Sequence, residues 1–226
     1  MEQTSKSTIP DLAESLAEAM PVLDRRQQEL ALELYRPLAL GAPVPPSTLA
    51  SELGCDEAEV VEALERWPGV FRDGDGRVTS FWGLAIPEMA HRFRVDGRRL
   101  FTWSAWDALF IPELIGHTAE VESRSPAGGA AVRLIVDPDG VREVDPETVV
   151  VSMLAPEEAF DQRVISSFCH FVHFFATPEE AAEWASEHAG TFVLSVFEAH
   201  ELGRLVNRRR FDRVLRSAAS GGRWPR

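Results

Sequence analysis

The hydrophobic pattern of this 226-residue chain changes from helical to strand-like about a third of the way along it. Leu30, Leu34 and Leu38 recur every four residues, the spacing of one face of an amphipathic helix. From His91 onward, short runs alternate apolar and polar residues and are separated by turn sequences such as Asp-Gly and Asp-Pro-Asp-Gly, as in antiparallel strands. A helical first part followed by a strand-rich part with a few helices predicts an α+β fold with a mostly antiparallel sheet.

The helical part of the sequence predicts a first domain over residues 23–85. Three amphipathic stretches are followed there by two strand-like runs on either side of Gly-Asp-Gly, which is a hairpin signal. Three helices and a hairpin in this order predict a winged helix. We expect residues 1–22 to be a poorly determined lead-in with one short helix at residues 11–20, and residues 90–218 to form the α+β domain.

The charge of the chain argues against nucleic acid as a partner. The net charge is −13, and the first eighty residues carry seven Lys and Arg against fifteen Asp and Glu. The helix that would enter a DNA groove, at residues 56–67, has five acids and one arginine. Such a surface repels phosphate backbones, so a winged-helix transcription regulator is disfavoured.

The chain shows no membrane or export signal. It has no run of about 18 apolar residues, the length that a spanning helix needs. Its N-terminus lacks the basic and then apolar layout of a signal peptide. We therefore expect a cytoplasmic protein without a membrane partner.

The stretch "TWSAWDALFIP" places two polar residues among aromatic and apolar ones. Ser104 and Asp107 stand three positions apart, so on a helix at residues 104–115 they would share a face. Burial disfavours the charged form of a carboxyl group, which raises its pKa and suits it to proton transfer. The alternative is that Asp107 only caps a turn or bonds the backbone.

The second candidate stretch is "SFCHFVHFF", which contains one of only two cysteines in the chain. On a strand, Cys169 and His173 would point to one face. They could then form a thiolate and its polariser, or two metal ligands, or simply part of the core. Two cysteines do not imply a disulfide framework, and Cys55 is expected to be a core or surface residue.

The chain resembles the organomercurial (alkylmercury) lyases in these same stretches. The resemblance covers nearly the whole length and is densest in "RRLFTWSAWDALFIPELIGHTAEVES", "SFCHFVHFFATPEEAAEWASEH" and "SVFEAHELGRLVNR". It implies protonolysis of carbon–mercury bonds in mercury resistance, with Asp107 as the acid and Cys169 as a thiol ligand of mercury. His173 is an additional candidate ligand. It further implies an organomercurial substrate, no required cofactor, Hg(II) as the bound product and a mercuric reductase as its recipient.

The chain departs from the family pattern at the first catalytic thiol, where it has Ser104. A hydroxyl is a hard ligand and does not replace a thiolate on the soft Hg(II) ion. Cys169 is then the only sulfur of the expected set, with Ser104 assisting or orienting Asp107. The alternative function is a relative without lyase activity that binds a soft metal or a small organic ligand in the same pocket.

Overall fold

The computed structural model of the protein describes residues 8–215. Its fold is α+β with mostly antiparallel pairing, as the sequence predicts. Parts of two sequence predictions, residues 1–7 of the lead-in and residues 216–218 of the second domain, lie outside the described residues. No helix in the described range is long and apolar enough to cross a membrane.

The larger sheet has eight strands in the order β1-β2-β3-β5-β4-β6-β7-β8, and all its neighbours pair antiparallel. One sheet therefore runs through both halves of the chain, and the predicted domain limits stay a prediction. The strands are β1 (Val70–Arg72), β2 (Val78–Phe81), β3 (Leu84–Ala85), β4 (His91–Val95), β5 (Arg98–Thr102), β6 (Ala119–Arg124), β7 (Ala131–Asp137) and β8 (Gly140–Asp145).

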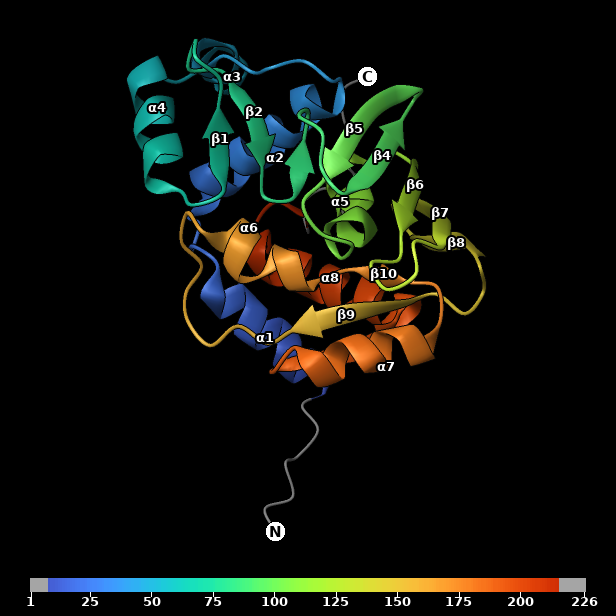
Figure 1. Ribbon diagram of the computed structural model, residues 1–226. Coiled ribbons are helices and arrows are strands. Elements are labelled where there is room, and N and C mark those ends of the chain that lie inside the picture. Colours follow the sequence, from blue (N-terminus) through green and yellow to red (C-terminus); the bar gives the residue numbers. More distant parts are fainter. Residues whose placement is uncertain (1–7, 216–226) are drawn as a thin grey trace.

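A smaller sheet of three strands lies in the lower half of the molecule as drawn in Figure 1. Its order is β10-β9-β11, again antiparallel. The strands are β9 (Val150–Leu154), β10 (Phe174–Phe175) and β11 (Thr191–Ser195). This sheet packs against α7 (Pro178–Glu187) and α8 (Val196–Arg210), and these elements together make up the C-terminal third of the described chain.

The three helices directly before the first hairpin follow the order that the sequence predicts. They are α2 (Arg25–Ala39), α3 (Pro46–Leu53) and α4 (Glu57–Arg66). Figure 1 shows α3 and α4 beside β1 and β2, whereas α2 reaches towards the centre of the molecule. There α2 packs against the central helix α5 (Asp107–Ile115), which links the N-terminal third to the rest of the core.

The central helix α5 is buried almost throughout, and it packs on α8 as well as on α2. Gly203 permits the close approach of α8, because a Cβ atom there would lie 2.5 Å from Phe110 Cβ. The Trp106 indole nitrogen also donates a hydrogen bond across this interface, to the Ala199 carbonyl oxygen at 3.0 Å. The first turn of α5 is therefore fixed from the side of α8.

The short helix that the sequence predicts at residues 11–20 is present in the structure, over residues 9–19. Residues Ile9–Ala19 form α1, whose first turn is closed by a reciprocal capping box between Thr8 and Asp11. Leu12 and Leu16 are buried, and the helix packs against α8. The amphipathic spacing of this helix ties it to the core.

Candidate active site

Ser104 and Asp107 meet at the start of α5, but they do not share a helix face. The Ser104 hydroxyl and the Ser104 backbone N–H each donate a hydrogen bond to Asp107 Oδ2, both at 2.8 Å. In return, the Asp107 N–H donates to Ser104 Oγ at 3.3 Å. This reciprocal pattern is that of a capping box with Ser104 at the cap, and the regular helix follows from Asp107, three residues after the predicted start.

The Asp107 carboxyl group lies in the interior, with only 6% of the residue exposed. Burial raises the pKa of Asp107 from 3.8 to about 7, against the opposing effect of its hydrogen bonds from Ser104. Both protonation states are therefore populated near neutral pH. A group with this property can accept a proton in one step and return it in the next.

The backbone around Cys169 is a tight turn, so the predicted strand over "SFCHFVHFFA" is wrong. The short helix α6 (Val164–Ser167) is followed by the 3₁₀ turn η1 (Cys169–Phe171), and only Phe174–Phe175 form a strand. The Val172 N–H donates to the Cys169 carbonyl oxygen at 3.1 Å, which closes the turn. A short apolar run has no periodicity that separates a strand from a buried turn, which explains the error.

The two candidate stretches are in direct contact. The Ala105 N–H donates to the Val172 carbonyl oxygen at 3.1 Å, and the rings of Trp106 and Phe168 pack edge to face at 6.3 Å. Cys169 is 4% exposed; its burial and the nearby Asp107 charge both raise the pKa of the thiol. Burial therefore keeps the Cys169 thiol protonated, and the thiol is within electrostatic reach of Asp107.

The hydrogen bond and ring contacts of His173 are made with other residues. Its Nε2 atom lies 2.7 Å from the His170 carbonyl oxygen, and its ring packs edge-on against Trp184 at 5.2 Å. Within residues 8–215, no set of three or more His, Cys, Asp and Glu side chains is arranged to hold a metal ion. The pairing of Cys169 and His173 on one strand face is wrong because no strand is present there.

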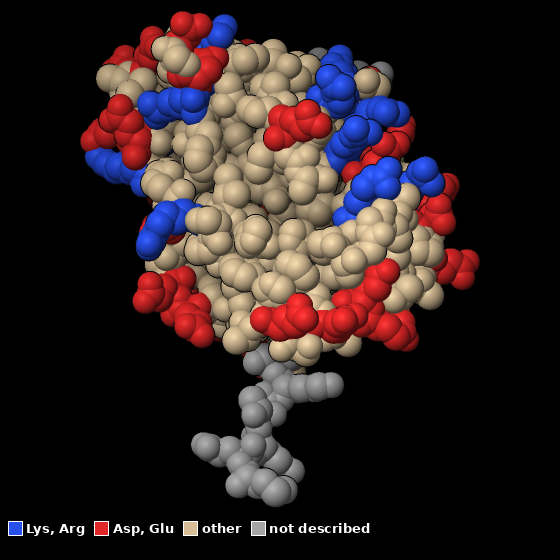
Figure 2. Space-filling model, viewed as in Figure 1, with Lys and Arg blue, Asp and Glu red and all other residues tan. Residues whose placement is uncertain are grey.

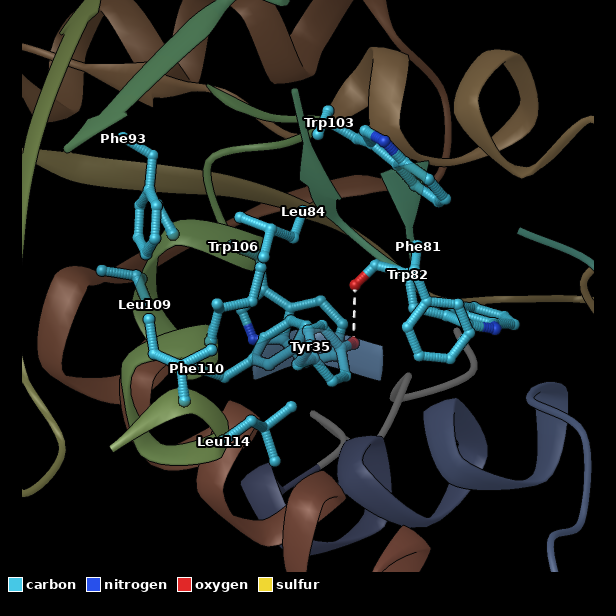
Figure 3. Close-up of a cluster of buried hydrophobic side chains, with 14 of the residues drawn as sticks. Tyr35, Phe81, Trp82, Leu84, Phe93, Trp103, Trp106, Leu109, Phe110 and Leu114 are labelled. Atoms are coloured by element: carbon cyan, nitrogen blue, oxygen red, sulfur yellow. Dashed lines mark hydrogen bonds between the residues drawn. The ribbon is translucent and has the colours of Figure 1, made fainter. Parts of the chain in front are cut away.

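A backbone corner that the sequence interpretation missed packs against Asp107. Trp82 and Gly83 both have positive φ values, of 30° and 96°, and a Cβ atom on Gly83 would lie 2.5 Å from Asp107 Cγ. The Tyr35 hydroxyl donates to the Trp82 carbonyl oxygen at 2.9 Å, the dashed line in Figure 3. A glycine within a strand-like pattern signals close backbone approach, and this signal was available in "FWGLAI".

The alkylmercury lyase family model matches residues 84–207, a segment that contains Ser104, Asp107 and Cys169. This chain belongs to the alkylmercury lyase family. The alkylmercury lyase of Staphylococcus epidermidis is 43% identical over 180 residues, which cover 78% of this chain and 82% of that protein. The alkylmercury lyase of Pseudomonas putida is 41% identical over 190 residues, covering 84% and 88%. The resemblance predicted from the sequence is therefore confirmed.

The fold of this family member also matches a solved structure, the mercury-bound form of MerB2. The two superimpose with a TM-score of 0.72 over 90% of this chain and 99% of that one, at 19% sequence identity. The similarity extends beyond residues 84–207, so it includes much of the helical N-terminal third. At this identity the comparison supports the fold alone.

Proposed function

We propose that this alkylmercury lyase family member cleaves the carbon–mercury bond of an organomercurial by protonolysis. The observation that carries the proposal is the buried Asp107 carboxyl group, which Ser104 holds in a stretch that hydrogen-bonds to the turn of Cys169 and whose pKa is raised to about 7. The leaving carbon needs a proton, and the mercury needs a soft ligand. Asp107 supplies the first and Cys169 the second.

The first step transfers the organomercurial to the protein. In a thiol-containing solution the substrate is a thiol adduct, R–Hg–SR′, because Hg(II) prefers thiolate ligands. The raised pKa of Cys169 keeps it protonated, so its proton moves to the Asp107 carboxylate as the sulfur binds mercury. The products are Cys169–S–Hg–R, protonated Asp107 and the free thiolate R′S⁻.

The second step breaks the carbon–mercury bond. Asp107 gives its proton to the carbon, which leaves with the bonding electron pair as R–H. The thiolate R′S⁻ takes the vacant position on mercury, giving Cys169–S–Hg–SR′ and the Asp107 carboxylate. A further molecule of external thiol then releases Hg(SR′)₂ and restores the Cys169 thiol. A mercuric reductase is the proposed recipient of this product.

Ser104 serves in this scheme as the orienting group of the acid. Its hydroxyl and its N–H both hold Asp107 Oδ2, which leaves the other carboxyl oxygen for proton transfer. The Ser104 hydroxyl does not bind mercury in this scheme. The external thiol therefore supplies the second sulfur that the chain lacks at position 104.

We also infer that α2–α4 with the β1–β2 hairpin form a winged-helix-like unit that covers the site. Its helix α2 contributes the buried Tyr35, which bonds the corner beside Asp107. The helix α4 of this unit has Glu57 and Glu59 in its first turn, and its Arg66 pairs with Glu62. Figure 2 shows acidic and basic side chains intermixed in this part of the surface, at the upper left of the view. A covering role suits this charge pattern better than DNA binding.

The test is release of benzene from phenylmercury in the presence of excess thiol. The parent should produce benzene well above the thiol-only background. Asp107→Asn should lower the rate at least about a hundredfold, the usual contribution of a positioned acid. Cys169→Ser should lose tight mercury binding, whereas Cys55→Ser, the matched control at the other cysteine, should match the parent.

Two outcomes contradict the proposal. In one, the parent releases no benzene above background although it is folded. In the other, Asp107→Asn or Cys169→Ser is as fast as the parent, which would remove the residue from the reaction.

A further inference from the structure

The acid of the proposed reaction rests against backbone rather than against a cation. A Cβ atom on Gly83 would lie 2.5 Å from Asp107 Cγ and 2.6 Å from its Oδ1 atom. Only glycine permits this approach, and its φ of 96° is also in the region that favours glycine. Asp107 is thus enclosed between Ser104 on one side and the Gly83 backbone on the other.

The Trp82–Gly83 corner is held in place by several contacts. Trp82 has a φ of 30°, which a bulky side chain adopts only when its surroundings impose it. The Tyr35 hydroxyl donates to the Trp82 carbonyl oxygen at 2.9 Å, and the Arg210 guanidinium lies over the Trp82 ring at 5.0 Å. The Gly83 carbonyl oxygen accepts a hydrogen bond from the Trp103 N–H at 3.0 Å, next to Ser104.

Tyr35 is the contact that reaches the corner from α2. It is fully buried in α2, far from the site in sequence, and burial raises the pKa of its hydroxyl, which therefore stays protonated and donates. The charged or titratable groups around it are Arg210 of α8 and Asp107 of α5. Figure 3 shows Tyr35 between the corner and the residues of α5.

We propose that Tyr35 and Gly83 are positioning residues of the lyase reaction, which act through the Trp82–Gly83 corner to hold the Asp107 carboxyl group for proton transfer. For its chemistry this inference rests on the proposed function. A displacement of about 1 Å in a reacting group can lower a rate a hundredfold, so a fixed backbone surface behind Asp107 has direct catalytic value.

The first test is Tyr35→Phe, which removes only the hydroxyl. We expect kcat for benzene release to fall about tenfold and KM to stay within about twofold, because binding at Cys169 is untouched. The matched control is Thr148→Val, which removes another hydroxyl bonded to a backbone carbonyl, that of Ala176 at 2.7 Å. The control should keep the kcat of the parent.

The second test is Gly83→Ala, in which the new methyl group must displace Asp107. We expect a loss in kcat of about a hundredfold. Gly41→Ala is its control, because Gly41 also has a positive φ, of 79°, but nothing within 4 Å of a Cβ atom. The difference between the two variants isolates the contact with Asp107 from backbone strain.

Hydrogen exchange of the Ser104 amide provides a readout that needs no activity. This N–H donates to Asp107 Oδ2, so it exchanges faster when Asp107 is released. In Tyr35→Phe we expect about tenfold faster exchange at Ser104 and unchanged exchange in β9. If the parent is inactive but shows this exchange result, the positioning of Asp107 by Tyr35 is supported and the proposed lyase function is contradicted.

The proposal is overturned by either of two results. The first is Tyr35→Phe with the kcat and the Ser104 exchange rate of the parent. The second is exchange that rises equally at Ser104 and in β9, since that would show a general loss of stability.

Discussion

The hydroxyl of Ser104 donates a hydrogen bond to the carboxylate of Asp107, with 2.8 Å between Oγ and Oδ2. A second bond reaches the same oxygen from the Ser104 N–H, and the Asp107 N–H donates back to Ser104 Oγ. The serine therefore has two tasks at this position. It favours the charged form of the carboxyl group, and it closes the first turn of α5.

Ser104→Ala should consequently raise the pKa of Asp107 further above about 7, because the carboxylate loses a donor. The lost cap should also lower the free energy of unfolding by about 1 kcal/mol. The pKa is measured by NMR titration of the labelled carboxyl carbon, and stability by urea unfolding. Ser195→Ala is the control, since Ser195 and Glu198 form the same box at the start of α8. A fall in the pKa of Asp107 would contradict the assignment.

Asp107→Asn should change how stability depends on pH. The folded pKa of Asp107 is about 7 and the ordinary value is 3.8, so the unfolded chain releases this proton first as pH rises. As pH rises from 3.8 to about 7, this difference lowers the free energy of unfolding of the parent by up to about 4 kcal/mol. At higher pH it lowers stability no further. The asparagine variant has no such proton. Its stability relative to the parent should rise by about 3 kcal/mol between about pH 5 and pH 8 in urea unfolding.

Duplex DNA should show no sequence-selective binding near physiological salt. The exposed face of α4 carries Glu57, Glu59, Glu62 and Glu65, and Arg66 is paired with Glu62. Such a helix repels phosphate groups in a groove. A fluorescence anisotropy titration checks this, and selective binding below about micromolar concentration would contradict it.

Local signals in the sequence predicted the hairpins and most helices correctly. The Asp-Gly turn between β4 and β5 has positive φ values at Asp96 and Gly97, of 48° and 76°, as this dipeptide indicates. The start of α5 was misplaced because a spacing of three residues suits both a shared helix face and a capping box. For Ser104 the box was the better reading, since serine favours helix starts over helix interiors.

Long-range contacts of the candidate site could not be predicted from the residues alone. The approach of Gly83 to Asp107 depends on how β3 pairs with β5, and the bond from Tyr35 depends on how α2 packs. No local pattern records either contact. The grouping of Ser104, Asp107 and Cys169 as candidate site residues came from the family resemblance rather than from periodicity, and their roles stay a prediction.

Ser104→Cys should raise carbon–mercury cleavage above the parent. The family resemblance implies that positions 104 and 169 converge, so a second sulfur at position 104 would bind Hg(II) together with Cys169 as a thiolate pair. Such a pair suits a soft ion better than one thiolate and a hydroxyl. If the second thiolate stabilises mercury in the transition state by only about 1.4 kcal/mol, the rate rises tenfold. We therefore expect cleavage to be about tenfold faster or more.

The Ser104→Cys measurement compares benzene release from phenylmercury at limiting external thiol, where the protein's own second sulfur matters most. Ser104→Ala is the control, because it also loses the hydroxyl bond to Asp107 but gains no sulfur. Cys169→Ser should remove tight mercury binding in both backgrounds. A parent as fast as Ser104→Cys would show that the hydroxyl suffices, since then the orientation of Asp107, rather than a thiolate pair, limits the rate.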